Sequence, residues 1–162
     1  MGVDLVAIVR IERLLGKYGV SFLQNFLRKS EIALCVKKAQ GGESSDLDSL
    51  LKNADISRFN VERIAGFYAA KEAISKALRC GISKHLTFKD IKLSKDSRGA
   101  PKAKLSKRAK KHFSVKKIAI SISHDKAQIR GSMGDKSNKS DSHLSPHSIE
   151  FKGFAIAIAL VK

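Results

Sequence analysis

Two acidic side chains stand where a carboxylate can hold a divalent cation or accept a proton. Asp4 lies between Val3 and Leu5 in a predicted strand that leads into a helix, so it also suits the start or cap of that helix. Glu72 lies in the middle of a predicted helix, where Lys76 at i+4 allows a surface ion pair. Glu72 also shares its helical stripe with alanines and cations. A carboxylate beside cations on a small-residue face suits a metal ion together with a phosphate group.

A third candidate is His124, which ends an apolar strand at a point where side chains emerge from a sheet. Ser121 and Ser123 precede it in the same strand. A contact with a ligand and a hydrogen-bonded edge histidine both fit this position. Glycine-rich nucleotide loops and zinc-protease motifs are absent, and Cys35 and Cys80 lack the spacing of a zinc site.

Hydrophobic periodicity predicts the elements that must hold these residues. The strongest helix is predicted over 61–79, with alanines that allow close backbone approach and Gly81 as its stop. A short strand around 3–5 precedes a helix that begins at Ile8 and ends at Gly16 or Gly19. The other predicted elements are an amphipathic segment over 22–35, a short helix over 46–56, a strand over 86–93, a hairpin turn at 96–99, and strands over 118–123 and 154–160.

Bulk composition narrows the choice of partners. The chain has 162 residues, of which 43% are hydrophobic, and a formal net charge of +17. Thirteen basic and two acidic residues lie between Lys84 and Lys117, a net of +11. A solvated face explains such a run, but so does a polyanionic partner: nucleic acid, an anionic membrane, an acidic protein or a phosphate-rich molecule. No stretch is long enough to span a bilayer and no signal peptide is evident, so a soluble cytoplasmic protein is expected.

One segment differs from the rest of the chain. Residues from about 128 to 152 are rich in Ser, Gly, Asp, Lys and His and show no periodicity. We therefore expect a single domain over 1–162 with a polar loop insertion at about 128–152. Such a loop is either a lid beside a site or an insertion that the fold tolerates.

Four groups of residues, in order along nearly the whole chain, resemble a known family. They are residues 2–6 (GVDLV) followed by 10–12, residues 69–78 (AAKEAISKAL) with 81–82, Gly99 with Pro101, and residues 120–124 (ISISH). The combination resembles the holo-[acyl-carrier-protein] synthases, the small bacterial-type 4'-phosphopantetheinyl transferases. The resemblance implies an α+β fold in which a small antiparallel sheet packs against helices. It also implies a homotrimer with coenzyme A bound between subunits.

The activity that the resemblance implies is transfer of 4'-phosphopantetheine from coenzyme A to a serine of apo acyl carrier protein, a strongly acidic partner. The reaction releases adenosine 3',5'-bisphosphate and serves fatty acid biosynthesis. In this resemblance Asp4 and Glu72 match the Mg2+ ligands, both count as catalytic together with Lys76, and Arg10 matches a residue that docks the carrier protein. The residues that match the coenzyme A site are Lys76, Gly81, Gly99, Pro101, Ser123 and His124.

The chain departs from the family pattern at Phe67, where the family commonly has an arginine after Gly66. A cation that the substrate normally meets is therefore missing, and Arg63 or Arg79 can replace it. The competing hypothesis is a non-enzymatic nucleic-acid-binding module, in which the basic segment contacts phosphates and the acidic residues are structural. The ordered motifs favour the enzyme, with neither nucleic acid nor membrane as a partner.

Overall fold

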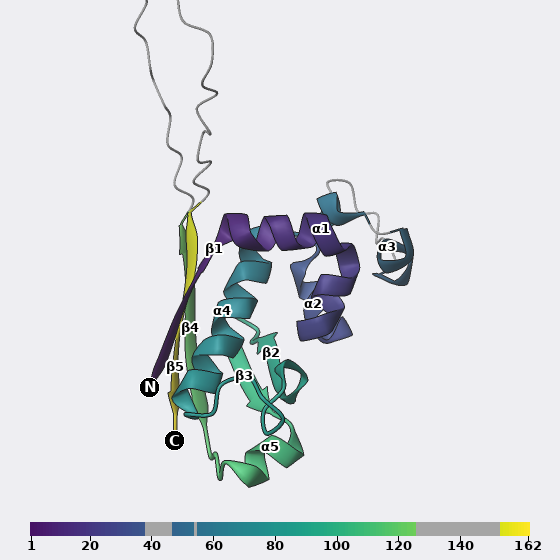
Figure 1. Ribbon diagram of the computed structural model, residues 1–162. Helices are drawn as coiled ribbons and strands as arrows, with labels where there is room; N and C mark the ends of the chain where they lie inside the picture. Colours follow the sequence, from purple (N-terminus) through teal and green to yellow (C-terminus); the bar gives the residue numbers. More distant parts are fainter. Residues whose placement is uncertain (38–46, 54, 126–152) are drawn as a thin grey trace, which may run out of the picture.

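The computed structural model describes residues 1–37, 47–53, 55–125 and 153–162. Its main sheet has three antiparallel strands in the order β1 (Gly2–Ala7), β5 (Phe154–Val161) and β4 (Ile118–Asp125). A second antiparallel pair is formed by β2 (Ile91–Lys95) and β3 (Pro101–Leu105). Helices cover one face of the main sheet, which is seen edge-on at the left of Figure 1. The predicted α+β fold, a small antiparallel sheet packed against helices, is confirmed.

The helices follow the predicted order, but the segment predicted over 22–35 is divided between two helices, the helix predicted over 61–79 ends at Ala77, and one helix is additional. The α-helices are α1 (Ile8–Phe26), α2 (Lys29–Cys35), α3 (Leu47–Asn53), α4 (Val61–Ala77) and α5 (Lys107–His112), and 3-10 turns span Ile56–Arg58 and Phe88–Asp90. The first helix continues past both predicted stops, because Gly19 adopts a φ of 56° as a kink and helix resumes beyond it. The periodicity does not predict α5, which begins where the Ser106 side chain accepts a hydrogen bond from the amide of Ala109.

The strand predicted over 86–93 begins only at Ile91. Asp90 accepts hydrogen bonds from the amide and hydroxyl of Thr87, at 3.0 and 2.9 Å, and so closes a 3-10 turn just before the strand. This capping arrangement takes the backbone donor that a longer strand would offer to a neighbour. The predicted hairpin is confirmed, with Leu93 opposite Ala103.

Small residues let α4 lie very close to the inner face of the main sheet. This face of β5 consists of three buried alanines, Ala155, Ala157 and Ala159. A Cβ atom added to Gly2 in β1 would lie 2.1 Å from the carbonyl oxygen of Ala73 in α4. Only glycine fits at such a distance, so β1 runs against the last turns of α4.

Large apolar side chains lie on the outer face of the same sheet, away from the helices. They alternate with the buried alanines of β5 and continue onto β1, where Val3 pairs with Ile158 and Leu5 with Ile156. The exposed apolar residues of this outer sheet face are Val3, Leu5, Phe154, Ile156, Ile158 and Leu160, each between 37% and 57% exposed. Large apolar side chains gathered on one face differ from the singly scattered apolar residues that are normal on a protein surface.

Lys71 is fully buried and ties α4 to three other segments. Its Nζ atom donates to the carbonyl oxygens of Phe26, at 2.8 Å, and Phe88, at 3.1 Å. It also pairs at 2.8 Å with the buried carboxylate of Glu31, whose other oxygen accepts the amide of Leu93 at 2.7 Å. Burial lowers the pKa of Lys71 to about 8, against the opposing charge of Glu31. The lysine of the AAKEA motif is thus a structural cross-link.

Asp90 joins the segment before β2 to the start of α5. Although burial raises its pKa, hydrogen bonds from Ser106 and Thr87 and contact with Arg108 hold the pKa well below its ordinary value. The Ser106 hydroxyl donates to Asp90 at 2.6 Å, and Arg108 forms an ion pair with the same carboxylate. A depressed carboxyl pKa stabilises the fold above the unfolded value, near 4, and this stabilisation is lost as the pH falls further.

We therefore expect Asp90→Asn to lower the free energy of unfolding by about 1–3 kcal/mol at pH 7, the usual contribution of charged hydrogen bonds. The difference from wild type should shrink as the pH falls below about 4, because Asp90 of the unfolded chain then takes up a proton while Asp90 of the folded protein is still ionised. Urea unfolding at pH 7 and pH 3 measures both quantities. Asp125→Asn, an exposed carboxylate on β4, is the matched control. An equal loss at both pH values would contradict the assignment.

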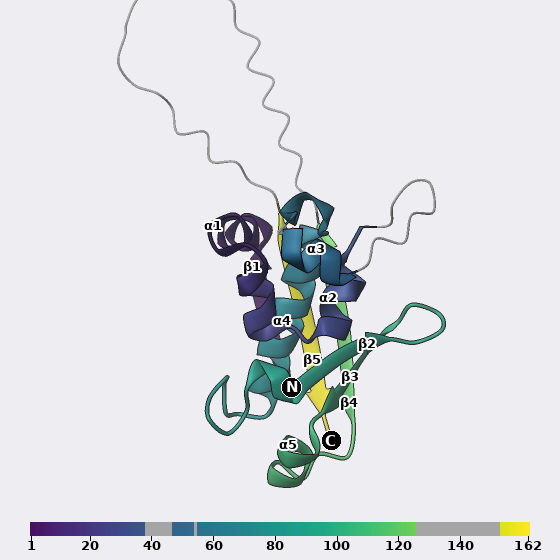
Figure 2. The same ribbon diagram turned by 90° about the vertical axis from the view of Figure 1, so that its right-hand side faces the viewer.

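The predicted insertion at about 128–152 lies outside the described residues, so the single domain over 1–162 stays a prediction. Among the described residues, no helix is long and apolar enough to cross a membrane. Figure 2, turned by 90° from Figure 1, shows β1 on one side of α4 and the β2–β3 hairpin with β4 on the other. This arrangement determines how the candidate site residues are distributed.

Candidate active site

Asp4 and Lys76 meet on the β1 flank of α4. Asp4 lies on the inward side of β1, with its side chain 14% exposed, and its Oδ1 atom is 2.6 Å from the Nζ atom of Lys76. Two predictions from local sequence are therefore wrong, namely that Asp4 caps the first helix and that Glu72 forms an ion pair with Lys76. Asp4 does not cap α1, whose N-cap is Ala7 without a side-chain hydrogen bond. Lys76 pairs with Asp4 and not with Glu72, because β1 runs directly beside the end of α4.

The two predicted carboxylates are electrostatically coupled. Burial raises the pKa of Glu72, the charge of Asp4 raises it further, and Lys76 and Arg10 act in the opposite direction. A hydrogen bond to Asp4 raises the pKa of Lys76. The Arg10 guanidinium lies 5.9 Å from the ring centre of Tyr68, which precedes Glu72 by one turn. The predicted docking residue Arg10 is thus adjacent to the carboxylate pair.

This carboxylate pair fits Mg2+ better than a transition metal. It offers hard oxygen donors from two separate elements, β1 and α4. Across the described ranges, no group of three or more His, Cys, Asp or Glu side chains could enclose a metal ion. Mg2+ is commonly held by one or two carboxylates and shares the rest of its coordination with water and substrate phosphate. Asp4 and Glu72 are therefore the residues that would hold it.

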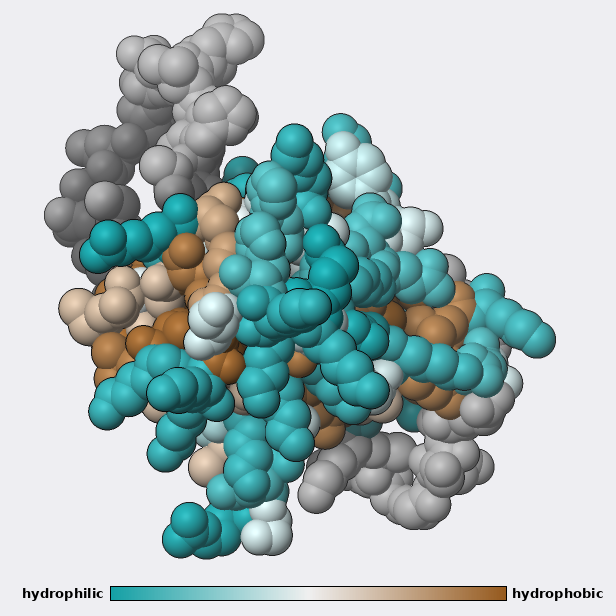
Figure 3. Space-filling view, turned by 90° about the horizontal axis from the view of Figure 1, so that it is seen from below, coloured by the Kyte–Doolittle hydropathy of each residue, from teal (hydrophilic) through white to brown (hydrophobic). Residues whose placement is uncertain are grey.

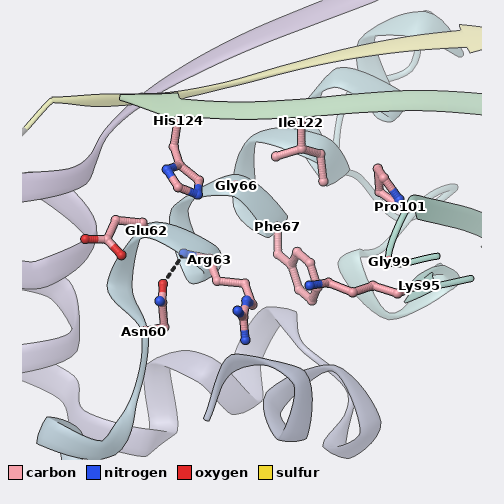
Figure 4. Close-up of a pocket in the computed structure, with 10 residues that line it drawn as sticks. All are labelled: Asn60, Glu62, Arg63, Gly66, Phe67, Lys95, Gly99, Pro101, Ile122 and His124. Atoms are coloured by element: carbon pink, nitrogen blue, oxygen red, sulfur yellow. Dashed lines mark hydrogen bonds between the residues drawn. The ribbon is translucent and has the colours of Figure 1, made fainter. Parts of the chain in front are cut away.

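A pocket of about 210 Å3 lies on the other flank of α4, between α4, β4 and the hairpin turn. In Figure 4, the first turns of α4 form one wall, β4 with Ile122 and His124 another, and the turn with Gly99 and Pro101 the third. The residues that line the pocket are Asn60, Glu62, Arg63, Gly66, Phe67, Lys95, Gly99, Pro101, Ile122 and His124. Three cationic or titratable nitrogen groups beside apolar surface suit a nucleotide with phosphates.

The structure brings together three of the six predicted coenzyme residues, namely Gly99, Pro101 and His124. Ser123 lies on the outer face of β4, because successive strand residues point to opposite faces. Gly81 follows the end of α4 with a φ of 61°, which accounts for glycine on backbone grounds. Like Lys76, it does not line the pocket.

Arg63, one of the two expected replacements for the missing cation, lines this pocket, and so does Lys95, which was not predicted from the sequence. Arg63 lies one turn before Phe67 on the same side of α4, and its Nη1 atom donates to the carbonyl oxygen of Leu34 at 2.6 Å. This bond orients the guanidinium beside the position where the family arginine is missing. Arg79 lies beyond the end of α4 and is not part of the pocket lining. The i−4 spacing to Phe67 is the signal that could have favoured Arg63.

The carboxylate pair and the pocket lie on opposite flanks of α4. Arg63 and Glu72 are nine residues apart, so at roughly 100° per residue they project from opposite sides of the helix. β1 and β4, which carry Asp4 and His124, are the two edges of the main sheet with β5 between them. Within one chain, the two halves of the predicted site therefore face different directions.

Together, the elements form a small α+β protein with a carboxylate pair on one flank of α4 and a pocket with basic side chains on the other. The chain belongs to the 4'-phosphopantetheinyl transferase superfamily, whose family model matches residues 1–159. It is 42% identical over 125 residues to the holo-[acyl-carrier-protein] synthase of Sulfurovum sp., a match covering 77% of this chain and 86% of the relative. The Helicobacter pylori (strain ATCC 700392 / 26695) enzyme of the same name is 40% identical over 125 residues, covering 77% of this chain and 87% of that one. The predicted family is confirmed.

Solved structures agree with this assignment. The holo-[acyl-carrier-protein] synthase of Helicobacter pylori in complex with coenzyme A superposes with a TM-score of 0.67 at 35% identity. The superposition covers 99% of this chain and 98% of that structure. The Neisseria meningitidis enzyme, at 20% identity and a TM-score of 0.59, shows the same fold over 99% of this chain and 95% of that one.

Proposed function

We propose that this protein transfers 4'-phosphopantetheine from coenzyme A to a serine of apo acyl carrier protein. The observation that carries the proposal is a half-buried carboxylate pair beside a lysine, in a chain of this family whose relative was solved with coenzyme A. The serine oxygen forms a bond to the phosphorus next to pantetheine, and the phosphoanhydride bond breaks. Adenosine 3',5'-bisphosphate leaves with the electron pair. The product supports fatty acid biosynthesis, and the cytoplasmic location stays a prediction.

The side chains of the carboxylate pair supply complementary parts of this chemistry. Glu72, half-buried beside Asp4, is placed to accept the proton of the serine hydroxyl, either directly or through a water molecule. Lys76, whose pKa is raised, stays cationic and stabilises charge on the leaving diphosphate oxygen. Asp4 holds Lys76 in position at 2.6 Å. Asp4 and Glu72 would hold Mg2+, which would supply positive charge against the charge that builds on the diphosphate.

The direct test incubates the protein with coenzyme A, Mg2+ and apo acyl carrier protein, followed by intact-protein mass spectrometry. The expected result is a carrier protein that gains one phosphopantetheine group. Omission of Mg2+ should prevent the gain. The absence of any adduct with every divalent ion would refute the activity.

We further propose that each active site combines the carboxylate pair of one subunit with the pocket of its neighbour in a homotrimer. Two observations support this. The two halves face opposite flanks of α4 within one chain, which suits a site completed by a second chain. The outer sheet face also exposes six apolar side chains, which a neighbouring copy would cover. Ser123, on that same outer face, would then lie next to the neighbouring subunit.

Mixing two inactive variants tests the shared site. Glu72→Gln spoils the carboxylate pair and His124→Ala spoils the pocket, so each alone should lose most activity. After the two are co-refolded in equal amounts, about a quarter of the sites in random trimers would combine two intact halves. Activity should therefore return to roughly that fraction of wild type. Light scattering reports the subunit number, and a mixture as inactive as its parents would contradict a shared site.

We propose Arg63 as the cation that replaces the missing family arginine at Phe67. Its guanidinium lines the pocket with Lys95 and is fixed by the bond to Leu34. Arg63→Met should raise the KM for coenzyme A by roughly 10-fold or more, the cost of losing a charged hydrogen bond. Arg79→Met is the matched control and should change this KM less than about two-fold. Steady-state kinetics with saturating carrier protein measures the KM for coenzyme A of both variants. A larger increase in Arg79→Met than in Arg63→Met would favour Arg79.

A further inference from the structure

Tyr68 is a polar aromatic residue on the same side of α4 as Glu72, which it precedes by one turn. By contrast, the face of the molecule that carries α5 has hydrophilic side chains over much of its surface, as Figure 3 shows from below. Charge on such a face attracts anions from a distance, but it does not orient the atoms of a reaction. Orientation requires groups within hydrogen-bond distance of the reacting atoms. Tyr68 is placed to supply one of these groups.

Three neighbours hold the ring of Tyr68 in place. The ring packs edge-on against Phe26, with ring centres 5.2 Å apart, and tilted against Phe88, with ring centres 5.4 Å apart. The Arg10 guanidinium lies over the ring, 5.9 Å from its centre. Phe26 is itself buried. Such contacts fix the plane of the ring, so the hydroxyl can occupy only a narrow range of positions.

The hydroxyl of Tyr68 makes no hydrogen bond to any residue that the structure describes, although the side chain is partly buried. Buried tyrosine hydroxyls usually have a hydrogen-bond partner. Phenylalanine would make the same ring contacts, so packing does not explain why a hydroxyl is present. The hydroxyl is therefore available to a group of a bound ligand.

The surroundings keep this hydroxyl protonated. Burial raises the pKa of Tyr68, the charge of Glu72 raises it further, and Asp4 acts in the same direction, while Arg10 opposes them. Both carboxylates therefore lie within electrostatic reach of the phenol. A phenol that stays neutral is a hydrogen-bond donor, and its strongest acceptors are anionic oxygens. Phosphate oxygens are acceptors of this kind.

We propose that Tyr68 is a catalytic residue whose hydroxyl donates a hydrogen bond to a non-bridging oxygen of the transferred phosphoryl group. The inference rests on the proposed function, in which this phosphoryl group reacts at the carboxylate pair. The serine oxygen forms its bond to phosphorus, the phosphoanhydride bond breaks, and the serine proton passes to Glu72 directly or through water. Tyr68 keeps its own proton throughout.

The serine oxygen is a less suitable acceptor for this hydroxyl than the phosphoryl oxygens. A hydrogen bond donated to the serine oxygen would weaken it as a nucleophile. A hydrogen bond donated to a phosphoryl oxygen instead stabilises the charge of the transition state. The hydroxyl of Tyr68 should therefore affect the rate of the chemical step and not the binding of either substrate.

The test removes only the hydroxyl. Tyr68→Phe keeps the ring, and Tyr18→Phe removes the hydroxyl of an exposed tyrosine on α1 as the matched control. With Mg2+ and both substrates saturating, the single-turnover rate constant of Tyr68→Phe should fall about 10- to 100-fold, the effect of losing one donor to a charged oxygen. The KM for coenzyme A and the KM for carrier protein should change less than about two-fold. Tyr18→Phe should leave all three within the same limit, and urea unfolding should be unchanged in both variants.

A sulfur-substituted substrate tests which oxygen accepts the hydrogen bond. The probe is coenzyme A with sulfur in place of one non-bridging oxygen on the phosphorus next to pantetheine, used as two separated diastereomers. Because sulfur is the weaker acceptor, one diastereomer should slow the wild type at least about 3-fold more than it slows Tyr68→Phe. The other diastereomer should slow both proteins equally. A tyrosine that only supported the fold would not produce this difference.

The outcomes separate this inference from the proposed function. A normal rate constant in Tyr68→Phe would overturn the role of Tyr68 while transfer remains intact. A sulfur effect that is equal in the two proteins for both diastereomers would also overturn it. A raised KM for carrier protein with a normal rate constant would assign the hydroxyl to carrier binding and contradict the inference. A wild-type protein that transfers nothing would instead refute the activity.

Discussion

Asp4→Asn is expected to lower phosphopantetheine transfer by roughly 10³-fold or more while the protein stays folded. The change keeps the size of the side chain but removes the charge that pairs with Lys76 and that would bind Mg2+. The midpoint of thermal unfolding should change little, because the pair lies partly in solvent, with the Lys76 side chain 51% exposed. Single-turnover transfer with saturating coenzyme A measures the effect.

The matched control for this substitution is Asp48→Asn. Asp48 also pairs with a lysine, Lys29, but lies on α3 and has no place in the proposed chemistry. Its transfer rate should stay within two-fold of wild type. Glu72→Gln should reproduce the loss seen in Asp4→Asn, because both carboxylates belong to one site. Normal turnover in either carboxylate variant would remove the assigned mechanism.

Lys71→Met is expected to lower the free energy of unfolding by about 3–5 kcal/mol, the usual cost of breaking a buried ion pair. The substitution leaves Glu31 charged and fully buried, and the carbonyl oxygens of Phe26 and Phe88 lose a donor. Glu31 still accepts the amides of Arg28 and Leu93, so α2 and β2 keep part of their support. Urea unfolding followed by circular dichroism measures the loss.

A second variant distinguishes a buried charge from simple loss of packing. Lys71→Met/Glu31→Gln removes the unpaired charge and keeps a hydrogen-bonding side chain at residue 31, so it should recover part of the lost stability. Lys84→Met, at an exposed lysine, should have little effect. If the double variant is as unstable as the sum of its single variants, the charge pairing between Lys71 and Glu31 has no net role.

The predictions from sequence were strongest for α4 and for the strands. The alanines that permit close approach, the alternation in β4 and β5, and the turn chemistry before Pro101 all specify local structure through spacing alone. The partners of individual residues were not predictable in this way. The i+4 spacing favours an ion pair between Lys76 and Glu72. Because Gly2 fits closely against Ala73, however, β1 lies alongside α4, and Lys76 pairs with Asp4 instead.

Adjacent residues of one motif also separate in the fold. Lys71 and Glu72 follow each other in AAKEA, yet Lys71 is enclosed among four segments and Glu72 reaches the carboxylate pair. A turn of about 100° per residue points neighbouring side chains toward different surroundings. The motif therefore identifies the helix, but it does not show which of its residues are structural and which belong to the candidate site.

The sequence alone determined the reactive group types, the elements that carry them, and the resemblance to a transferase family. Only the tertiary structure decided that the carboxylates and the pocket occupy opposite flanks of α4, that Arg63 and Lys95 join the pocket, and that β5 turns its large side chains outward. The physical reason is that helical and strand periods show which residues share a face. They do not show what covers that face, because this depends on contacts between segments far apart in the chain.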